Sequence, residues 1–231
     1  VEYYWYISGK ISRQDMEGKY PVEWRAAYNE ALCAELGNPK SGHQPEIDKK
    51  ISETLRGSRN WVLIGGPPCQ AYSLVGRSRM LGALKDKSGN LVDGGKAFFK
   101  DHRHKLYRQY MRIIALHGPA VFVMENVKGI LSSRLDDKRI FPQILEDLRD
   151  PSAAAKQYEW NNAQKNKYRI VSFVTGTEPR AGREKEFLIR AEKYGIPQTR
   201  HRVILLGIRE DIFAKINGRI TPLTSVAGPN I

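Results

Sequence analysis

Apolar residues along the chain form short continuous runs that are separated by stretches of helical periodicity. The runs predict buried strands at 61–64, 120–124, 168–175, 187–191 and 203–207. Four further segments have apolar positions every three or four residues, which predicts helices at 23–36, 45–55, 105–117 and 140–148. Strands that alternate with helices indicate an α/β fold with a mostly parallel open sheet, flanking helices and an antiparallel member late in the chain.

Three other segments lack a clear period. Residues 1–6 are aromatic and predict either a strand or a packed arm. Residues 71–104 are rich in Gly, Lys and Arg, and we expect a long mobile loop there, of the kind that closes over active sites. The polar stretch after residue 148 reads as an insertion.

The composition narrows the class of protein and of partner. The 231 residues are enough for one α/β domain, and two cysteines exclude a disulfide framework. We find no membrane-length apolar run and no leader, so we expect a soluble cytoplasmic protein with no membrane partner, on the nucleoid if bacterial and nuclear if eukaryotic. The 38 Lys and Arg against 25 Asp and Glu give a net charge of +13, which attracts polyanions, although a solvated lysine-rich surface has the same composition.

Cys69 lies in the Gly-Gly-Pro-Pro-Cys-Gln turn that follows the apolar run 61–64. The carboxyl ends of buried strands are where open α/β sheets place their chemistry. Two prolines stiffen the turn and its neighbours are not core residues, so we interpret Cys69 as a nucleophile. Cys33 lies on the apolar side of the predicted helix 23–36, and we interpret it as a buried packing residue.

Glu125 follows the run 120–124 as Cys69 follows the first run. In a parallel sheet both positions reach the same edge, where a thiol and a carboxyl can share one pocket and the carboxyl can donate a proton or a hydrogen bond. The other interpretation is that Glu125 caps the next helix or turn.

Arg200 and Arg202 precede the last predicted strand with one residue between them. Alternation places both guanidinium groups on one face, where they can bind phosphates or a base carbonyl, although structural ion pairs explain them equally well. His201 points to the other face, and we interpret it as a solvated or packed histidine.

Three multi-residue motifs occur in one order: GGPPCQAYS at 65–73, FVMENVKGIL at 122–131 and KYGIPQTRHRVILLGI at 193–208. In wording and order they resemble the cytosine-5 DNA methyltransferase family. The resemblance covers roughly residues 50–210 and is specific because three separate motifs agree. It implies a Rossmann-like fold, S-adenosylmethionine as cofactor, double-stranded DNA as partner, DNA methylation by base flipping, and no metal.

The resemblance also implies a role for each motif. Cys69 would add to carbon 6 of a flipped cytosine, Glu125 would hold and protonate the ring nitrogen, and Arg202 would bind the base carbonyl. Arg200 would steady the base or a phosphate. The resemblance further implies substrate contacts at Pro68, Gln70, Ser73 and Asn126, and cofactor contacts at Pro67 and Pro68.

Parts of the family pattern are not found in this sequence. Residues 1–57 contain no Gly-rich strand-turn for the cofactor, and no room for a target-recognition region follows residue 207. We therefore expect a partial catalytic domain, incomplete at both ends, which alone binds S-adenosylmethionine poorly and methylates nothing at a useful rate. It would comprise an N-terminal helical segment at 1–57, catalytic motifs at 58–210 and a tail at 211–231. A second chain that supplies missing parts, or a cognate restriction enzyme, would be a partner in a restriction-modification role.

Other functions stay open at this point. One is methylation of cytosine in transfer RNA, since one branch of the family acts there with nearly the same motifs. Another is a non-catalytic nucleic-acid-binding subunit, which the missing cofactor turn favours and the intact Cys69 and Glu125 disfavour. A generic thiol hydrolase ranks third, because no His-Asp pair is placed to activate the thiol.

Overall fold

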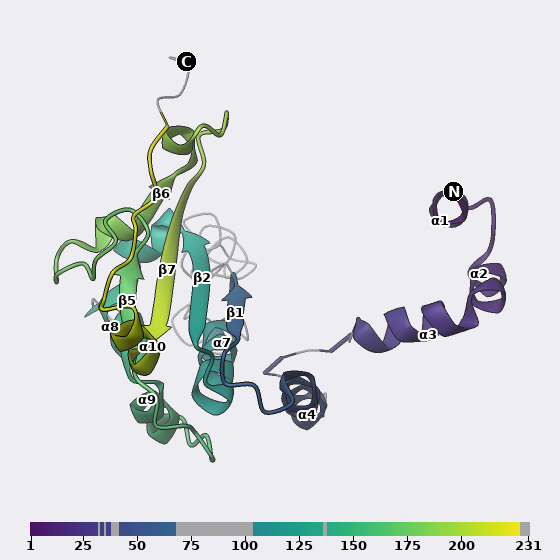
Figure 1. Ribbon diagram of the computed structural model, residues 1–231, viewed down its shortest axis with the longest axis horizontal. Helices are drawn as coiled ribbons and strands as arrows, with labels where there is room; N and C mark the ends of the chain where they lie inside the picture. Colours follow the sequence, from purple (N-terminus) through teal and green to yellow (C-terminus); the bar gives the residue numbers. More distant parts are fainter. Residues whose placement is uncertain (32, 35, 38–41, 68–103, 136–137, 227–231) are drawn as a thin grey trace, which may run out of the picture. The chain divides into compact units, whose positions relative to one another are not determined.

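The computed structural model describes the chain except residues 32, 35, 38–41, 68–103, 136–137 and 227–231. It divides into two compact units, Val1–Glu35 and Leu36–Ile231 (Figure 1). No helix of the described part is long and apolar enough to cross a membrane.

The N-terminal unit contains three short helices, α1 (Glu2–Ile7), α2 (Arg13–Lys19) and α3 (Pro21–Glu30). Ser12 and Asp15 form a reciprocal capping box that starts α2, and Pro21 occupies the first turn of α3. The expected strand or arm at 1–6 is therefore wrong, and so are the limits of the predicted helix 23–36. Cys33 lies beyond the end of α3 and is exposed, so its interpretation as a packing residue is also wrong.

The larger unit is built on a five-stranded sheet. Its strands, in chain order, are β1 (Val62–Gly65), β2 (Val121–Val127), β5 (Tyr168–Ser172), β6 (Leu188–Arg190) and β7 (His201–Arg209). The spatial order is β1-β2-β7-β5, and β6 also pairs with β7. β1 and β2 run parallel, while β7 is antiparallel to β2, β5 and β6 (Figure 1). Four strands thus share one direction and the last strand opposes them, which confirms the predicted mostly parallel open sheet.

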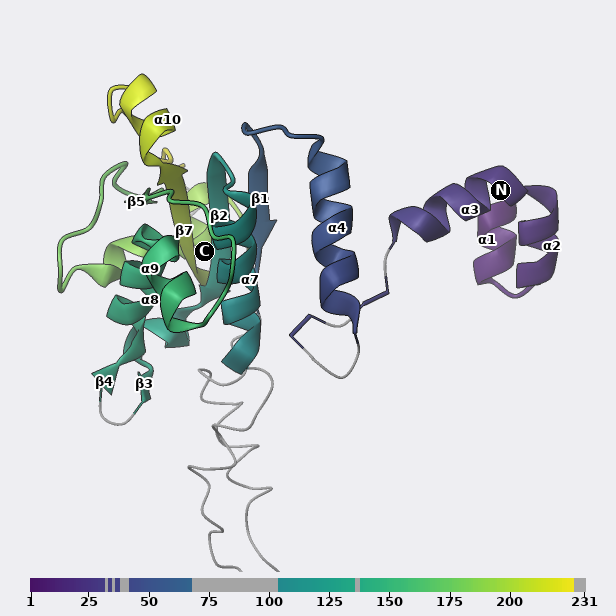
Figure 2. The same ribbon diagram turned by 90° about the horizontal axis from the view of Figure 1, so that it is seen from below.

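Three helices lie on one side of the sheet: α7 (His104–His117), α8 (Ile140–Arg149) and α9 (Pro151–Gln157) (Figure 2). The main core joins α7 and α8 to the strands through Met111, Ile114, Leu148, Phe122 and Leu205. A Cβ on Gly207 would overlap the Phe122 ring, so this strand position requires glycine. The helices predicted at 105–117 and 140–148 are confirmed, whereas the presumed insertion after residue 148 forms α9.

Short elements connect the strands at the edge where β2 ends. They are η1 (Lys128–Ser132), the hairpin of β3 (Arg134–Leu135) and β4 (Lys138–Arg139), η2 (Glu184–Phe187) and η3 (Ala191–Tyr194). α10 (Glu210–Lys215) follows β7 and lies on the other side of the sheet from α7 (Figure 2).

The helix predicted at 45–55 is confirmed as α4 (His43–Leu55), and α4 is held to α7 by charge. Both oxygens of Asp48 accept hydrogen bonds from Arg112, one of them at 2.9 Å. Burial opposes the charge of Asp48, yet the Arg112 guanidinium holds its pKa below the usual value. His117 Nε2 lies 3.7 Å from Asp48 Oδ1, and burial lowers the pKa of this histidine.

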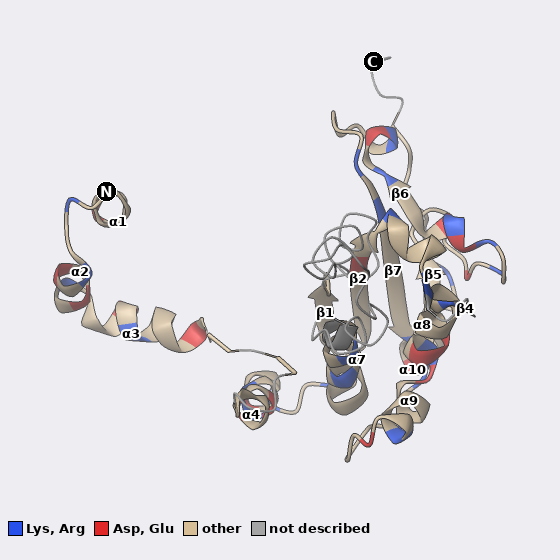
Figure 3. Cartoon of the chain, turned by 180° about the vertical axis from the view of Figure 1, so that it is seen from behind, with Lys and Arg blue, Asp and Glu red and all other residues tan. Residues whose placement is uncertain are grey.

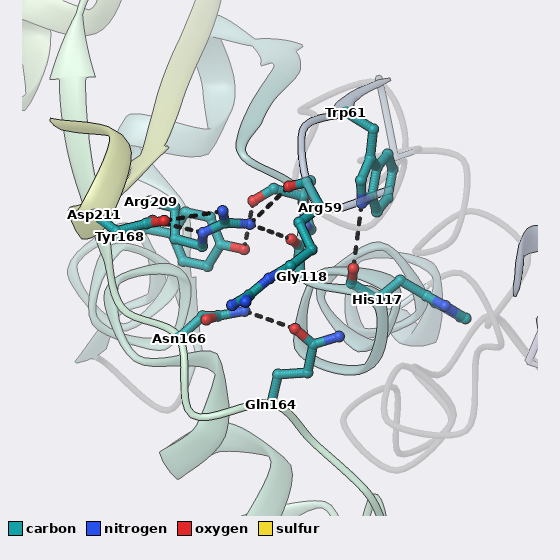
Figure 4. A network of polar contacts seen from close by, with 10 residues as sticks. Arg59, Trp61, His117, Gly118, Gln164, Asn166, Tyr168, Arg209 and Asp211 are labelled. Carbon is teal, nitrogen blue, oxygen red and sulfur yellow. Dashed lines mark hydrogen bonds and ion pairs between the residues drawn. The ribbon is translucent and has the colours of Figure 1, made fainter. Parts of the chain in front are cut away.

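A second polar network lies at the end of the sheet where β7 finishes (Figure 4). Arg209 is 5% exposed, and its Nη1 donates to the carbonyls of Arg59 at 3.0 Å and Gly118 at 2.8 Å. Its Nε donates to Asp211 at 2.6 Å. This guanidinium therefore joins the residues before β1, the turn after α7 and the end of β7, and it fixes how β1, β2 and β7 align.

Candidate functional site

Glu125 and Arg202 face each other across the β2–β7 pair. Arg202 is the register partner of Val127, two residues from Glu125, so the two side chains leave the same face of the sheet. Arg202 Nε lies 2.7 Å from Glu125 Oε1, and the side chains are 26% and 41% exposed. Arg202 Nη1 also donates to the carbonyl of His201 at 2.8 Å, which fixes the guanidinium beside the carboxylate.

Glu125 is a strand residue. β2 continues through Asn126 to Val127, so the expectation that the strand ends at residue 124 and that Glu125 lies in the following turn is wrong. The physical reason is continued pairing with β7, together with burial of alternate residues as far as Asn126. The alternative interpretation of Glu125 as a cap of the next helix is likewise excluded, because η1 has no side-chain cap.

The Gly65-Gly66-Pro67 turn begins directly beside the Glu125 carboxylate. A Cβ on Gly66 would lie 3.0 Å from Glu125 Oε2, closer than ordinary side-chain contacts. Glycine at this position therefore lets the carboxylate approach the backbone of the turn.

Asn126 ties the turn to β2 from the opposite face of the strand. It is 4% exposed, and its Nδ2 donates to the carbonyl of buried Pro67 at 3.4 Å. Its Oδ1 accepts from the Val127 amide at 2.9 Å. Both ends of the amide are thus occupied, which makes Asn126 a positioning residue for the start of the turn.

Tyr110 of α7 packs against Gly65 at the start of the same turn. The sequence did not identify it as a site residue. Its hydroxyl donates to the Val123 carbonyl at 2.9 Å, and a Cβ on Gly65 would lie 2.7 Å from its ring. Burial raises the pKa of Tyr110, which keeps the hydroxyl neutral as a donor. In the sequence, Tyr110 is only one of the apolar positions of the predicted helix 105–117. Such a position does not show whether the side chain packs in the core or supports a turn.

Four predicted site residues lie outside the described residues: Pro68, Cys69, Gln70 and Ser73. The expected loop at 71–104 falls there too, apart from His104, where α7 begins. The described chain stops at Pro67, two positions before Cys69. Of the predicted site, the structure thus brings together Glu125, Asn126, Arg202 and Pro67.

Arg200 and His201 lie where β7 begins. Arg200 precedes the strand and is exposed, with its amide donating to the Gln198 carbonyl at 2.8 Å. The regular alternation that was expected to align Arg200 with Arg202 does not extend to it, because β7 starts at His201. His201 Nε2 lies 2.7 Å from Glu192 Oε1, so this histidine is paired rather than simply solvated.

The electrostatics of the site are dominated by the Glu125–Arg202 pair. The His201 contact lowers the pKa of Glu192, after a backbone hydrogen bond that has the larger effect. Across the described ranges, no group of three or more His, Cys, Asp or Glu side chains is arranged to hold a metal ion.

Comparison with known proteins shows to which family the sequence belongs. The sequence model of the C-5 cytosine-specific DNA methylase family matches residues 14–152, which include the turn and Glu125. The chain belongs to this family.

Individual relatives extend the match. Type II methyltransferase M.Bpa9945I of Bacillus paralicheniformis is 28% identical over 208 residues, which is 87% of this chain and 38% of the relative. Type II methyltransferase M.BspRI of Lysinibacillus sphaericus is 32% identical over 170 residues, 74% of this chain and 27% of its own length. DNA (cytosine-5-)-methyltransferase M.ApeKI of Aeropyrum pernix is 32% identical over 153 residues, 65% and 27% respectively.

The chain spans about a quarter to two fifths of the length of these curated relatives. The family model stops at residue 152, whereas Arg202 lies in β7. The fold of this methylase-family chain nevertheless returns Arg202 to Glu125 at 2.7 Å. The arginine is thus joined to the matched region by strand pairing.

Proposed function

We propose that the chain carries the catalytic centre of a DNA (cytosine-5-)-methyltransferase, with Cys69 as nucleophile and Glu125 and Arg202 as the groups that hold the base. The observation that carries the proposal is the Glu125–Arg202 pair at 2.7 Å beside the turn that leads to Cys69. Family membership and the relatives' names support the same reaction.

Covalent geometry limits how far the thiol can lie from the pair. Cys69 follows Pro67 by two residues, so their Cα atoms lie within about 7.6 Å of each other. Pro67 is itself tied to Asn126, the neighbour of Glu125, at 3.4 Å. A cytosine ring that contacts the carboxyl group of Glu125 is therefore within reach of a thiol attached to this turn.

The first step is addition of the Cys69 thiolate to carbon 6 of an extruded cytosine. A new carbon–sulfur bond forms, the π pair of the 5,6 double bond shifts to make a 4,5 double bond, the π pair between carbon 4 and the ring nitrogen moves onto that nitrogen, and the nitrogen takes a proton from the carboxyl of Glu125. Carbon 5 becomes nucleophilic as a result. After methyl transfer, the ring nitrogen returns its proton to Glu125, solvent takes the carbon 5 proton, and the Cys69 thiolate leaves, which restores the aromatic ring.

Arg202 and Glu125 divide the recognition of the base between them. A base that enters the site accepts from the Arg202 guanidinium on its carbonyl, while the Glu125 carboxyl faces the ring nitrogen. Arg202 thus orients the base and Glu125 supplies the proton. Arg200, exposed at the start of β7, is available to a phosphate beside the base.

S-adenosylmethionine would supply the methyl group. The described residues fit this cofactor only in part. Val62 and Ile64 expose apolar side chains on the sheet face of Glu125, which suits an adenosyl group, but the Pro67 carbonyl is already bonded to Asn126 and residues 1–57 contain no Gly-rich turn. We therefore assign no step to contacts with the cofactor.

The test is methyl transfer by an active full-length form of the protein, from labelled S-adenosylmethionine to a cytosine-containing DNA duplex and, in parallel, to a transfer RNA transcript. We expect transfer to carbon 5 of cytosine in DNA, its loss in Cys69→Ser, and its retention in Cys33→Ser, because Cys33 is exposed in the N-terminal unit. Transfer to RNA alone would support the transfer RNA alternative. Transfer that survives Cys69→Ser would contradict the proposal.

A further inference from the structure

A cavity of about 620 Å³ opens where β2 ends, and its walls come from four separate segments. η1 contributes Lys128, β4 contributes Arg139, η2 contributes Glu184 and Lys185, and β6 contributes Arg190. Four cations and one carboxylate therefore surround the space. Figure 3 shows blue segments gathered around β6, in keeping with this composition.

The single carboxylate is already engaged. Glu184 Oε2 lies 3.7 Å from Arg139 Nη1, and Glu184 Oε1 accepts from the Gly182 amide at 3.1 Å. Lys128, Lys185 and Arg190 are exposed, and within the described residues none of them forms an ion pair. The cavity consequently presents three exposed cations from three different elements, of which Arg190 also interacts with Glu192 at longer range.

The strand register places this cavity next to the Glu125–Arg202 pair. Val127 and Ile189 are both register partners of Arg202, one on each side of β7. Lys128 directly follows Val127, and Arg190 directly follows Ile189. Paired strands lie only about 4.8 Å apart, so both cations start from backbone close to Arg202. Arg190 leaves the sheet on the opposite face from Arg202. The cavity and the Glu125–Arg202 pair therefore lie on opposite faces of the sheet, beside the same strand ends.

We propose that this cavity binds a backbone phosphate of the DNA strand beside the target cytosine. The inference rests on the proposed function, which places the extruded base at Glu125 and Arg202. Lysine and arginine side chains that converge from several segments are the usual ligands of backbone phosphates, and such contacts position the nucleic acid without reading its sequence. The cavity would thus hold the strand in position while the base occupies the site on the other side of the strand end.

The test is DNA binding by the full chain, measured by fluorescence anisotropy with a labelled duplex at several salt concentrations. One variant combines Lys128→Gln, Lys185→Gln and Arg190→Gln. The matched control combines Lys156→Gln, Lys165→Gln and Lys215→Gln, which removes the same charge from exposed positions of α9, the loop after it and α10. Circular dichroism melts check that both variants fold.

We expect the cavity variant to bind at least ~10-fold more weakly at low salt, with a salt slope reduced by about 1, since each neutralised phosphate contributes about 0.9. The control variant should bind within about threefold of the unmodified chain. Equal losses in the two variants would overturn the cavity assignment but leave the proposed function standing, because they would reflect overall charge alone. If the unmodified chain bound no DNA at any salt concentration, both proposals would fall.

Discussion

Arg202 Nε lies 2.7 Å from Glu125 Oε1, although 77 positions separate the two residues in the sequence. The contact exists because β7 returns antiparallel beside β2 and pairs Arg202 with Val127. A guanidinium against a carboxylate is complementary to a planar amide-like ring that has an acceptor and a basic nitrogen on one edge. Cytosine has such an edge.

The Glu125–Arg202 pair provides a first prediction. Glu125→Gln keeps the shape of the side chain but removes the proton that the ring nitrogen takes, so we expect the methyl-transfer rate to fall by roughly 10²- to 10⁴-fold. Arg202→Lys keeps the charge but loses the planar fork, and we expect a smaller fall of about 10²-fold. Single-turnover kinetics on duplex DNA measures both.

The matched control is Glu192→Gln. Glu192 Oε1 lies 2.7 Å from Nε2 of His201, which is the residue of β7 next to Arg202. Glu192 plays no part in the proposed chemistry. Glu192 is partly buried, but Gln keeps the shape of its side chain, so the variant should leave the rate within about threefold of the unmodified protein. Equal losses in the Glu125 and Glu192 variants would show that pairing along β7, rather than chemistry at Glu125, controls the rate.

Two glycines separate a site effect from a core effect. Gly66→Ala places a Cβ 3.0 Å from Glu125 Oε2, so the carboxylate must move while the core is untouched. We expect a rate loss of at least ~10-fold, because small displacements of a catalytic group are costly, and little change in melting temperature. Gly207→Ala forces a methyl into the Phe122 ring and should destabilise the fold by about 3 kcal/mol or more. Thermal melts and rates on both variants measure the two effects, and a Gly66→Ala protein with a normal rate would contradict the placement of Glu125.

Much of the fold was predictable because its signals are local. The apolar runs that became β1, β2 and β7 and the periodic segments that became α4, α7 and α8 carry their own burial pattern. The helices α1 and α2 were missed, although Ser12 and Asp15 have the spacing of a capping box, because their apolar residues have no period that faces a core. The end of β2 was misplaced because a charged residue after an apolar run is typical of a turn. Only the pairing of Glu125 with Ile204 of β7 shows that the strand continues.

The site was predictable only as separate motifs. Glu125 and Arg202 were both identified, yet their contact depends on the register of β7 against β2, which no local pattern specifies. Tyr110 and Asn126 donate hydrogen bonds to the backbone carbonyls of Val123 and Pro67. In the sequence, nothing distinguishes residues with this role from other tyrosines and asparagines.

The contact between α4 and α7 predicts a dependence of stability on pH. Burial lowers the pKa of His117, so the unfolded chain binds a proton more readily than the folded chain does. The neutral histidine therefore contributes its full stability above its ordinary pKa of about 6.5, and this contribution is lost as the pH falls from there toward the folded value. We expect the melting temperature to drop as the pH falls below about 6.5.

His117→Gln removes the titrating group and should flatten this part of the profile. Asp48→Asn is the companion variant, because the pKa of Asp48 is also lowered, with burial opposed by Arg112, and its stabilising effect is lost only at lower pH, near about 4. It should leave a decline above pH 5 in place. An unchanged slope in the His117 variant would show that another group is responsible.

Covalent attack by Cys69 is tested most directly by trapping it on DNA. An active full-length form of the protein is incubated with S-adenosylmethionine and a duplex that contains 5-fluorocytosine, and complexes that survive denaturing electrophoresis are counted. Fluorine at carbon 5 cannot leave as a proton does, so the adduct should accumulate with the unmodified chain and with Cys33→Ser, and peptide mapping should locate the base on Cys69. An adduct that persists in Cys69→Ser, or that maps to Cys33, would contradict the assignment of Cys69 as the nucleophile.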